Sequence, residues 1–325
     1  MTTLHVHFDR PLADDEAAHF RPLLAPGVAV TEGGDPPAGT AVLVSGRPTR
    51  EQLAAPGLRA LVIPWAGLPD ETGDLLRDFP DVSVHNLHHN AAPVAELAMM
   101  LLLAAAKFAL RYDRAIRAND WRLRYERPAP TVLLDGKTAL ILGYGAIGRR
   151  VAVACRALGM NTLATRRRLG SPETDAGTEV HPPDALRDLL PRADAVIICL
   201  PHTPATDGLL GAAELALLPA QAVLVNIGRG RIVDERALYE ALRDGRLQAA
   251  GLDVWYSYPP DEAARAAWPP SAYPFHELDN VIMSPHRGGA ADETARLRMT
   301  ALAEMLNEAA AGREMGNRVD VVAGY

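Results

Sequence analysis

The sequence predicts an α/β protein with two domains, each built on a doubly wound parallel sheet. Short apolar runs of strand length alternate along the chain with segments of helical pattern, an order typical of parallel sheets covered by helices. The chain has 325 residues and is 48% hydrophobic, which is enough for two cores. A glycine-rich turn at residues 143–148 opens the second series of strands.

The first series occupies the N-terminal 90 residues. Patches rich in proline, glycine and acidic residues separate its apolar runs. The predicted strands are LHVHF (4–8), AVLVSG (41–46), LRALVIPW (58–65) and DVSVHN (81–86), and the predicted helices are TREQLAAP (49–56) and ETGDLLRDF (71–79).

A long helix and a second series follow. The helical pattern opens at Pro93, a residue favoured in a first turn, and continues to Trp121. We expect residues 1–92 and 288–325 to form one domain, and residues 93–287 the other. The remaining predicted strands are KTALILG (137–143), NTLATR (161–166), DAVIICLP (194–201), AVLVNIG (222–228), AAGLDVW (249–255) and NVIMSPH (280–286), with helices at 149–159, 234–245 and 292–312 and a short one at 261–268.

Composition favours a cytoplasmic enzyme that acts on a small molecule. A net charge of -7 and a pI near 5.8 argue against nucleic acid or an anionic membrane as partner. No signal peptide is visible, and the most apolar segment, 95–110, contains Lys107 and is too short to span a membrane. No metal site is predicted, because Cys155 and Cys199 lie far apart in sequence inside apolar stretches and strand alternation scatters the histidines at 85, 88 and 89.

The glycines of GYGAIG predict a dinucleotide site of the Rossmann type. Gly143, Gly145 and Gly148 form a GxGxxG between a strand and a helix, where they permit a tight turn and close approach of the backbone to a pyrophosphate. The amides at the helix N-terminus donate to the phosphates. The predicted contacts therefore include Tyr144, Ala146 and Ile147.

Three arginines follow the next predicted strand. At this position an acid would bind the ribose hydroxyls of NAD, but the sequence has Arg166, Arg167 and Arg168. Guanidinium groups suit a 2′-phosphate. We therefore expect a preference for NADP(H), with NAD(H) as the second option; a solvated basic loop without a ligand is the alternative.

Three further side chains follow predicted strands of the second series. Arg229, Asp253 and His286 are expected at the carboxyl ends of these strands, where α/β proteins bind ligands. Taken singly, they also fit a surface ion pair, a strand-end cap and a core histidine.

At this point the sequence resembles the D-isomer-specific 2-hydroxyacid dehydrogenase family. The resemblance implies a flavodoxin-like substrate domain beside the Rossmann domain, and a homodimer formed through the helix after Pro93. The motifs that carry it are VAELAMMLLL, DGKTALILGYGAIGRRVA, LPHTPATDGLL, NIGRGRIVDERALYEALRDGRL, GLDVW and PFHELDNVIMSPH.

The resemblance also implies residue roles. Arg229 would bind the carboxylate of a 2-oxo acid and polarise its carbonyl, and His286 would donate or accept the proton. Asp253 would lie near the nicotinamide as an acceptor or an electrostatic support. Further cofactor contacts would be Cys199, Leu200, Pro201, Thr206, Ile227 and Gly289, and further substrate contacts Gly67, Leu68 and Asn90.

Tyr258 departs from the family pattern. An acid usually stands five residues after the aspartate and pairs with the histidine, whereas tyrosine supplies no negative charge. Our hypothesis is that His286 still serves, with a lower pKa and a reduction optimum shifted towards acid. Alternatively, Asp261 or Glu262 supplies the charge from the loop.

The substrate side departs from the pattern as well. In LVIPWAGLPD, Pro69 stands where a glycine is common and has no amide to donate. Trp65 would form an aromatic wall or pack within its loop. The 256–275 loop is longer than usual, so Trp268 and Tyr273 would cover the cleft or reach a partner subunit, and Arg287 would assist a second acidic group.

The resulting functional prediction is an NADP(H)-dependent reduction of a small 2-oxo acid to a D-2-hydroxy acid. Two alternatives remain. One is a non-catalytic NAD(P)-sensing protein of corepressor type, which would bind dinucleotide without turnover. The other is a formate-type dehydrogenase, whose branch of the family also lacks the acid.

Overall fold

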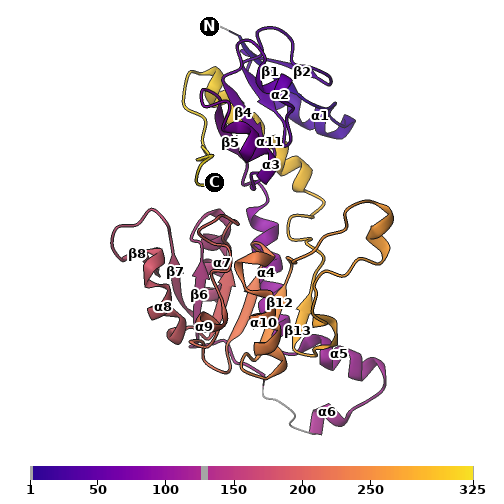
Figure 1. Cartoon of the computed structure of the whole chain (residues 1–325), viewed down its shortest axis with the longest axis vertical. Coiled ribbons are helices and arrows are strands. Elements are labelled where there is room, and N and C mark those ends of the chain that lie inside the picture. Colours follow the sequence, from indigo (N-terminus) through magenta and orange to yellow (C-terminus); the bar gives the residue numbers. More distant parts are fainter. Residues whose placement is uncertain (1–2, 126–130, 325) are drawn as a thin grey trace. The chain divides into compact units, whose positions relative to one another are not determined.

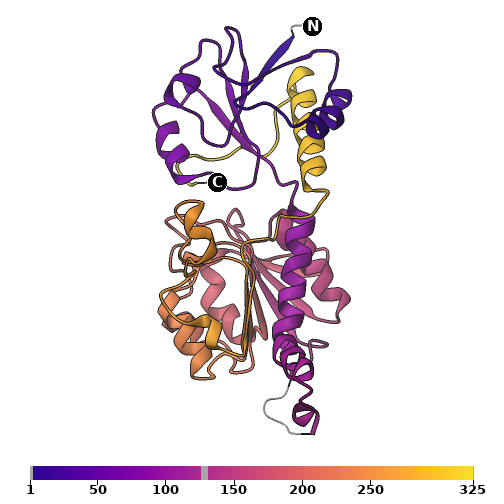
Figure 2. The same cartoon turned by 90° about the vertical axis from the view of Figure 1, so that its right-hand side faces the viewer.

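The computed structural model describes residues 3–125 and 131–324. Contacts divide the chain into two compact units, and each is described below by itself. Unit 1 comprises Met1–Asn90 and Ala290–Tyr325, and unit 2 comprises Ala91–Gly289 (Figures 1 and 2).

Unit 1 contains a five-stranded parallel sheet in the order β2-β1-β3-β4-β5. This order is that of flavodoxin-like folds. Its helices are α1 (Asp14–Phe20), α2 (Arg50–Leu53), α3 (Asp70–Leu76) and α11 (Thr294–Ala310). The strands are β1 (Leu4–Phe8), β2 (Val28–Glu32), β3 (Val42–Val44), β4 (Ala60–Ile63) and β5 (Ser83–Asn86).

The two ends of the chain share one core in unit 1. Val6 and Phe20 near the N-terminus pack in the same buried cluster as Leu302 and Leu306 of α11. An ion pair between Glu16 of α1 and Arg298 of α11 adds to this contact. The C-terminal helix therefore completes the N-terminal sheet.

Unit 2 contains an eight-stranded sheet in the order β13-β12-β11-β10-β6-β7-β9-β8. All neighbours are parallel except β8 and β9, and the order matches a Rossmann domain extended at both edges. The strands are β6 (Thr138–Leu142), β7 (Asn161–Thr165), β8 (Glu173–Asp175), β9 (Thr178–His181), β10 (Ala195–Ile198), β11 (Val223–Asn226), β12 (Ala249–Leu252) and β13 (Val281–Met283).

Helices cover both faces of this sheet and enclose two apolar clusters. On one face α4 (Ala91–Ala106) lies along β11 and β12 and packs against α7 (Ala146–Ala157) (Figure 2). The other cluster includes residues of α8 (Leu186–Leu189), α9 (Ala212–Leu215) and α10 (Glu235–Arg243). The predicted α/β fold class is confirmed.

The prediction of one long helix from Pro93 to Trp121 is wrong. Three helices occupy the segment: α4, α5 (Ala109–Arg117) and α6 (Arg122–Tyr125). Phe108 is buried and left-handed at φ 50°, so α4 ends before it. Val132 stabilises this end, because its amide donates to Ala106 O at 2.9 Å and its carbonyl accepts from Lys107 Nζ at 2.6 Å.

The bend between α4 and α5 also bears on membrane crossing. Among the described residues, no single helix has both the length and the apolar composition that a membrane span requires. Only α4 and α5 taken together pass that test, and they are bent by 66°.

Candidate active site

The glycine turn between β6 and α7 has the geometry of a phosphate cradle. Gly143 has φ 99°, and a Cβ there would lie 3.0 Å from the carbonyl oxygen of Cys199. A Cβ on Gly148 would lie 2.1 Å from Gly143 O, so this glycine allows close packing of helix and turn. A Cβ on Gly145 would meet nothing within 4 Å. The open space therefore lies at Gly145, at the N-terminus of α7, where a pyrophosphate fits.

Other predicted cofactor contacts lie on neighbouring strands. Cys199, Leu200 and Pro201 follow β10, and Ile227 follows β11. Because β6, β10 and β11 are adjacent and parallel, their carboxyl ends lie at the same edge as the glycine turn. Gly289 is the last residue of unit 2.

Two of the predicted contacts are engaged in local structure. Tyr144 is buried, and its hydroxyl donates to Asp175 O at 3.2 Å. Thr206 Oγ1 accepts from the amide of Thr203 at 2.8 Å and donates to Pro201 O at 2.8 Å. Both side chains therefore shape the edge around the candidate cofactor site.

The arginine run lies beside a hairpin that the sequence analysis missed. Arg166 follows β7 and pairs with Glu173 of β8 at 2.6 Å, while Arg167 and Arg168 are exposed. The hairpin has short polar strands joined by a turn with positive φ at Ala176 and Gly177, a geometry typical of tight hairpins. The Asp-Ala-Gly sequence at 175–177 was its only local signal.

Arg229, Asp253 and His286 follow three adjacent strands, β11, β12 and β13. Arg229 is exposed, and its Nη1 donates to Gly228 O at 2.8 Å. Asn226 fixes this loop, because its side chain donates to Arg229 O at 2.9 Å and accepts from Gly228 N at 3.0 Å. The sequence analysis did not single out Asn226.

Asp253 holds the turn that carries His286. Its carboxylate is 1% exposed and accepts hydrogen bonds from Ser284 Oγ, from the amide of Arg287 at 2.8 Å and from the amide of Gly288 at 3.0 Å. These donors stand on both sides of His286, which has a left-handed backbone at φ 57°. Such a conformation is unfavourable for a residue other than glycine, so the carboxylate stabilises it. Ser284 was also missed.

Tyr258 is the hydrogen-bond partner of His286. Its Oη lies 3.0 Å from His286 Nδ1 and accepts from the backbone amide of Trp255 at 3.1 Å. The acids proposed as alternatives bind within their own loop: Asp261 accepts from Ala264 N at 2.9 Å, and Glu262 pairs with Arg265 at 3.2 Å.

His286 and Tyr258 are both exposed at the surface, and the partial burial of each side chain favours its uncharged form. Burial lowers the pKa of His286 below its usual 6.5, and the positive charge of Arg229 lowers it further, while Asp253 opposes the shift. Burial also raises the pKa of Tyr258 above 10. At neutral pH the imidazole and the phenol are therefore both uncharged.

Most of unit 2 matches a known protein family. Residues 99–288 match the family described as D-isomer specific 2-hydroxyacid dehydrogenase, NAD binding domain. The chain belongs to this family.

Named relatives of the dehydrogenase family align over much of the chain. A D-3-phosphoglycerate dehydrogenase of Methanocaldococcus jannaschii is 32% identical over 252 residues, which are 77% of this chain and 44% of that protein. A glyoxylate reductase of Aeropyrum pernix is 40% identical over 214 residues, or 64% of this chain and 60% of that one. The chain thus spans about half the length of these relatives.

Solved structures of the family share the complete fold. A D-isomer specific 2-hydroxyacid dehydrogenase from Xanthobacter autotrophicus Py2, in complex with NADPH and MES, covers 100% of both chains with a TM-score of 0.79 and 26% identity. A related protein from Polaromonas covers 98% of this chain and 100% of its own, with a TM-score of 0.69 and 25% identity.

The 256–275 loop of this family member folds onto unit 2. Ser271 Oγ donates to Glu235 Oε1 at 2.6 Å, and Tyr273 stacks on Tyr239 with ring centroids 5.2 Å apart. Trp268 Nε1 donates to Ser257 Oγ at 2.7 Å while much of the indole stays exposed. Tyr273 therefore anchors the loop, whereas Trp268 and Tyr258 are exposed to solvent.

The predicted substrate residues of unit 1 follow β4 and β5. Gly67 and Leu68 lie between β4 and α3, and Asn90 has a buried Oδ1 without a hydrogen-bond partner among the described residues. The indole of Trp65 packs against Gly46, where a Cβ would lie 1.9 Å from it. Trp65 therefore packs within its own unit. Arg287 has its amide on Asp253, and its side chain is exposed.

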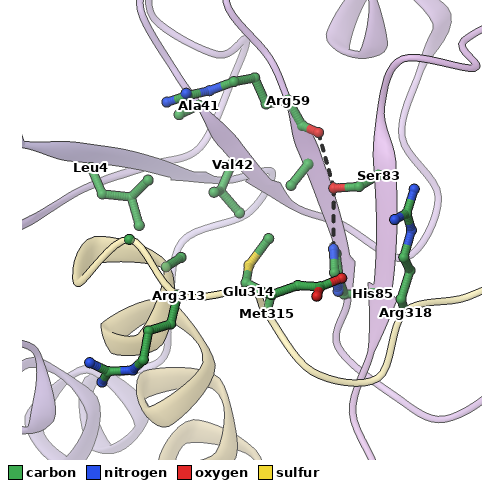
Figure 3. A pocket seen from close by; sticks show the side chains of 13 residues that line it. Leu4, Ala41, Val42, Arg59, Ser83, His85, Arg313, Glu314, Met315 and Arg318 are labelled. Atoms are coloured by element: carbon green, nitrogen blue, oxygen red, sulfur yellow. Dashed lines mark hydrogen bonds between the residues drawn. The ribbon is translucent and has the colours of Figure 1, made fainter.

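A cavity of about 350 Å³ in unit 1 lies away from these residues (Figure 3). Its lining includes Leu4, Ala60 and Ser83, the first residues of β1, β4 and β5, so it lies at the amino ends of the strands. Figure 3 shows the side chains of Arg59, Arg313 and Arg318 extending in different directions around it. Ligands of such sheets bind at the carboxyl ends, and this cavity is not the candidate site.

Within 3–125 and 131–324, no three His, Cys, Asp or Glu side chains gather closely enough to hold a metal ion.

Proposed function

We propose that the chain is an NADP(H)-dependent oxidoreductase that reduces a small 2-oxo acid to the D-2-hydroxy acid. The observation that carries the proposal is the set of three adjacent strand ends, which bear Arg229, Asp253 and His286 at the same edge as the glycine cradle. The glyoxylate reductases among the relatives support a small 2-oxo acid as substrate.

In the proposed chemistry, Arg229 is the cation that binds the substrate and His286 is the proton donor. Arg229 binds the carboxylate of the substrate and polarises its carbonyl. A bound nicotinamide would supply the hydride. The charged ring of His286 donates a proton to the oxygen that becomes the alkoxide, and in the reverse direction a neutral ring with a bare Nε2 takes the proton back. Asp253 keeps the His286 turn in place through its three hydrogen bonds.

The NADP(H) preference rests on the arginine run. Arg167 and Arg168 are exposed at the end of β7, and Arg166 is held by Glu173. A 2′-phosphate would bind these guanidinium groups in competition with the carboxylate of Glu173. The NADPH bound in the Xanthobacter relative supports this assignment.

The proposal includes a cytoplasmic homodimer formed through α4 and α5. These helices expose large apolar side chains, which include Met100 at 46%, Leu103 at 38% and Ile116 at 44%. Exposed apolar side chains gathered on neighbouring elements are typical of protein interfaces. Sedimentation of the wild type and of Met100→Glu would test it, because a charge in the interface should release monomers.

Turnover with matched variants tests the catalytic assignment. Oxidation of NADPH and NADH is followed with glyoxylate, hydroxypyruvate, pyruvate, phenylpyruvate and branched 2-oxo acids. His286→Asn should lower kcat/KM by about 10²–10⁴-fold. His276→Asn is the control, because this histidine is exposed on the loop before β13. Dinucleotide binding without turnover on any of these acids would overturn the proposal in favour of a sensor.

A further inference from the structure

The hydrogen bond between Tyr258 and His286 has a direction that the surrounding atoms define. The phenol oxygen accepts from the amide of Trp255 at 3.1 Å, and a backbone amide can only donate. One lone pair of Oη is therefore used, and its single proton remains to be placed. The other hydrogen-bond partner of Oη is His286 Nδ1 at 3.0 Å.

Relative basicity decides which of the two groups donates. An imidazole nitrogen, with a reference pKa of about 6.5, is a far stronger base than a neutral phenol oxygen, and a phenol, with a reference pKa of about 10, is a good donor. The hydrogen bond from phenol to Nδ1 is therefore stronger than the reverse one. A carboxylate at the position of Tyr258 would act in the opposite way, because it can only accept and would draw a proton onto Nδ1.

We propose that Tyr258 is a positioning residue that fixes the neutral ring of His286 in the tautomer with its proton on Nε2. The ring then presents a hydrogen-bond donor, and not a base, on the side away from Tyr258. It suits a substrate with a carbonyl oxygen at that position better than one with a hydroxyl group. This consequence for the substrate rests on the proposed function, whereas the tautomer is a property of the protein alone.

The tautomer can be read without turnover. Full-length protein labelled with ¹⁵N-histidine is examined at a pH above 7 by two-bond ¹⁵N–¹H correlation, without dinucleotide or substrate. His286→Asn identifies the signals of His286. The wild type should show a protonated Nε2 and a bare Nδ1. A proton on Nδ1 in the wild type would overturn the proposal.

Two variants and one control separate Tyr258 from the intrinsic preference of the ring. Tyr258→Glu should move the proton to Nδ1. Tyr258→Phe should lower the Nε2–H to Nδ1–H ratio by about fivefold, the contribution of one ordinary hydrogen bond. Tyr256→Phe removes a phenol two residues away and should change nothing. An unchanged ratio in Tyr258→Phe would contradict the proposal, whatever the turnover assay gives.

Discussion

The backbone amide of Arg287 donates a hydrogen bond of 2.8 Å to Asp253 Oδ1. This contact explains why an acid lies at the end of an apolar strand, where its charge would otherwise be costly. Asp253 accepts from both sides of the His286 turn, so its charge is stabilised by donors that also set the position of His286, the proposed proton donor. The sequence motifs predicted that Asp253 and His286 lie in one site. The hydrogen bonds between Asp253 and the turn around His286 give the physical reason.

Asp253→Asn should loosen this turn. An amide keeps the size of the side chain, but its NH₂ group faces backbone donors. We expect a loss of about 2–3 kcal/mol in the free energy of unfolding, in the range for hydrogen bonds to a charged group. kcat/KM should fall as well, because His286 leaves its left-handed conformation. Asp279→Asn is the control, since this exposed acid makes only a long contact of 3.8 Å with Arg114. Equal stability of the two variants would show that the hydrogen bonds of Asp253 do not stabilise the His286 turn.

The pH profile of reduction should follow His286. In the proposed mechanism, reduction consumes a proton that the charged imidazole supplies, and partial burial lowers the pKa of this ring below 6.5. kcat/KM should therefore be highest at acid pH and fall as the pH rises through a midpoint below 6.5. Tyr258→Glu places a negative charge next to Nδ1, which favours the charged ring and should raise the midpoint by about one to two pH units. An unchanged midpoint would show that Tyr258 does not act through His286.

Gly145 and Gly148 of the phosphate cradle should respond differently to substitution by alanine. Gly145→Ala adds a methyl group to open space, so its thermal stability should equal that of the wild type while dinucleotide affinity falls by about tenfold. Gly148→Ala pushes a methyl group towards Gly143 O and should destabilise unit 2 by about 1–3 kcal/mol. Calorimetric binding and thermal unfolding check both. Unaltered affinity in Gly145→Ala would place the pyrophosphate elsewhere.

The ion pair between Glu173 and Arg166 should limit NADPH affinity. Glu173→Gln frees the guanidinium and removes a negative charge near the proposed 2′-phosphate. NADPH should bind up to about fivefold tighter, the range for an exposed pair, with NADH unchanged. Glu179→Gln is the charge-matched control, because Glu179 pairs with Arg192 and His181. A similar gain in both variants would indicate a general effect of net charge.

The strands at the centres of both sheets could be predicted from the sequence. Runs such as TALIL and AVII are buried on both faces and read as uninterrupted apolar segments. The edge strands β2 and β8 were missed because they are only partly buried and have mixed composition. The break at Phe108 was invisible, since a tertiary contact with Val132 ends α4 in a helix-favouring sequence.

The residues of the candidate site could be predicted where they belong to a recognisable sequence motif. Arg229, Asp253 and His286 stand at strand ends, so the alternating pattern placed them at one edge of the sheet. Asn226 and Ser284 were not predicted, because their role is to hydrogen-bond to Arg229 O and to Asp253. These contacts exist only once the turns have formed. The partner of Nδ1 also needed the structure, since three residues of one loop competed for that role.

The shared core of unit 1 has a consequence for biosynthesis. Residues 91–289 are contiguous, so unit 2 can fold as soon as they leave the ribosome. Residues 1–90 emerge earlier, yet their sheet lacks the buried side chains of α11, such as Leu302 and Leu306, until that helix has been made. Residues 1–90 therefore wait with exposed apolar surface while residues 91–293 are made, a state that invites chaperone binding.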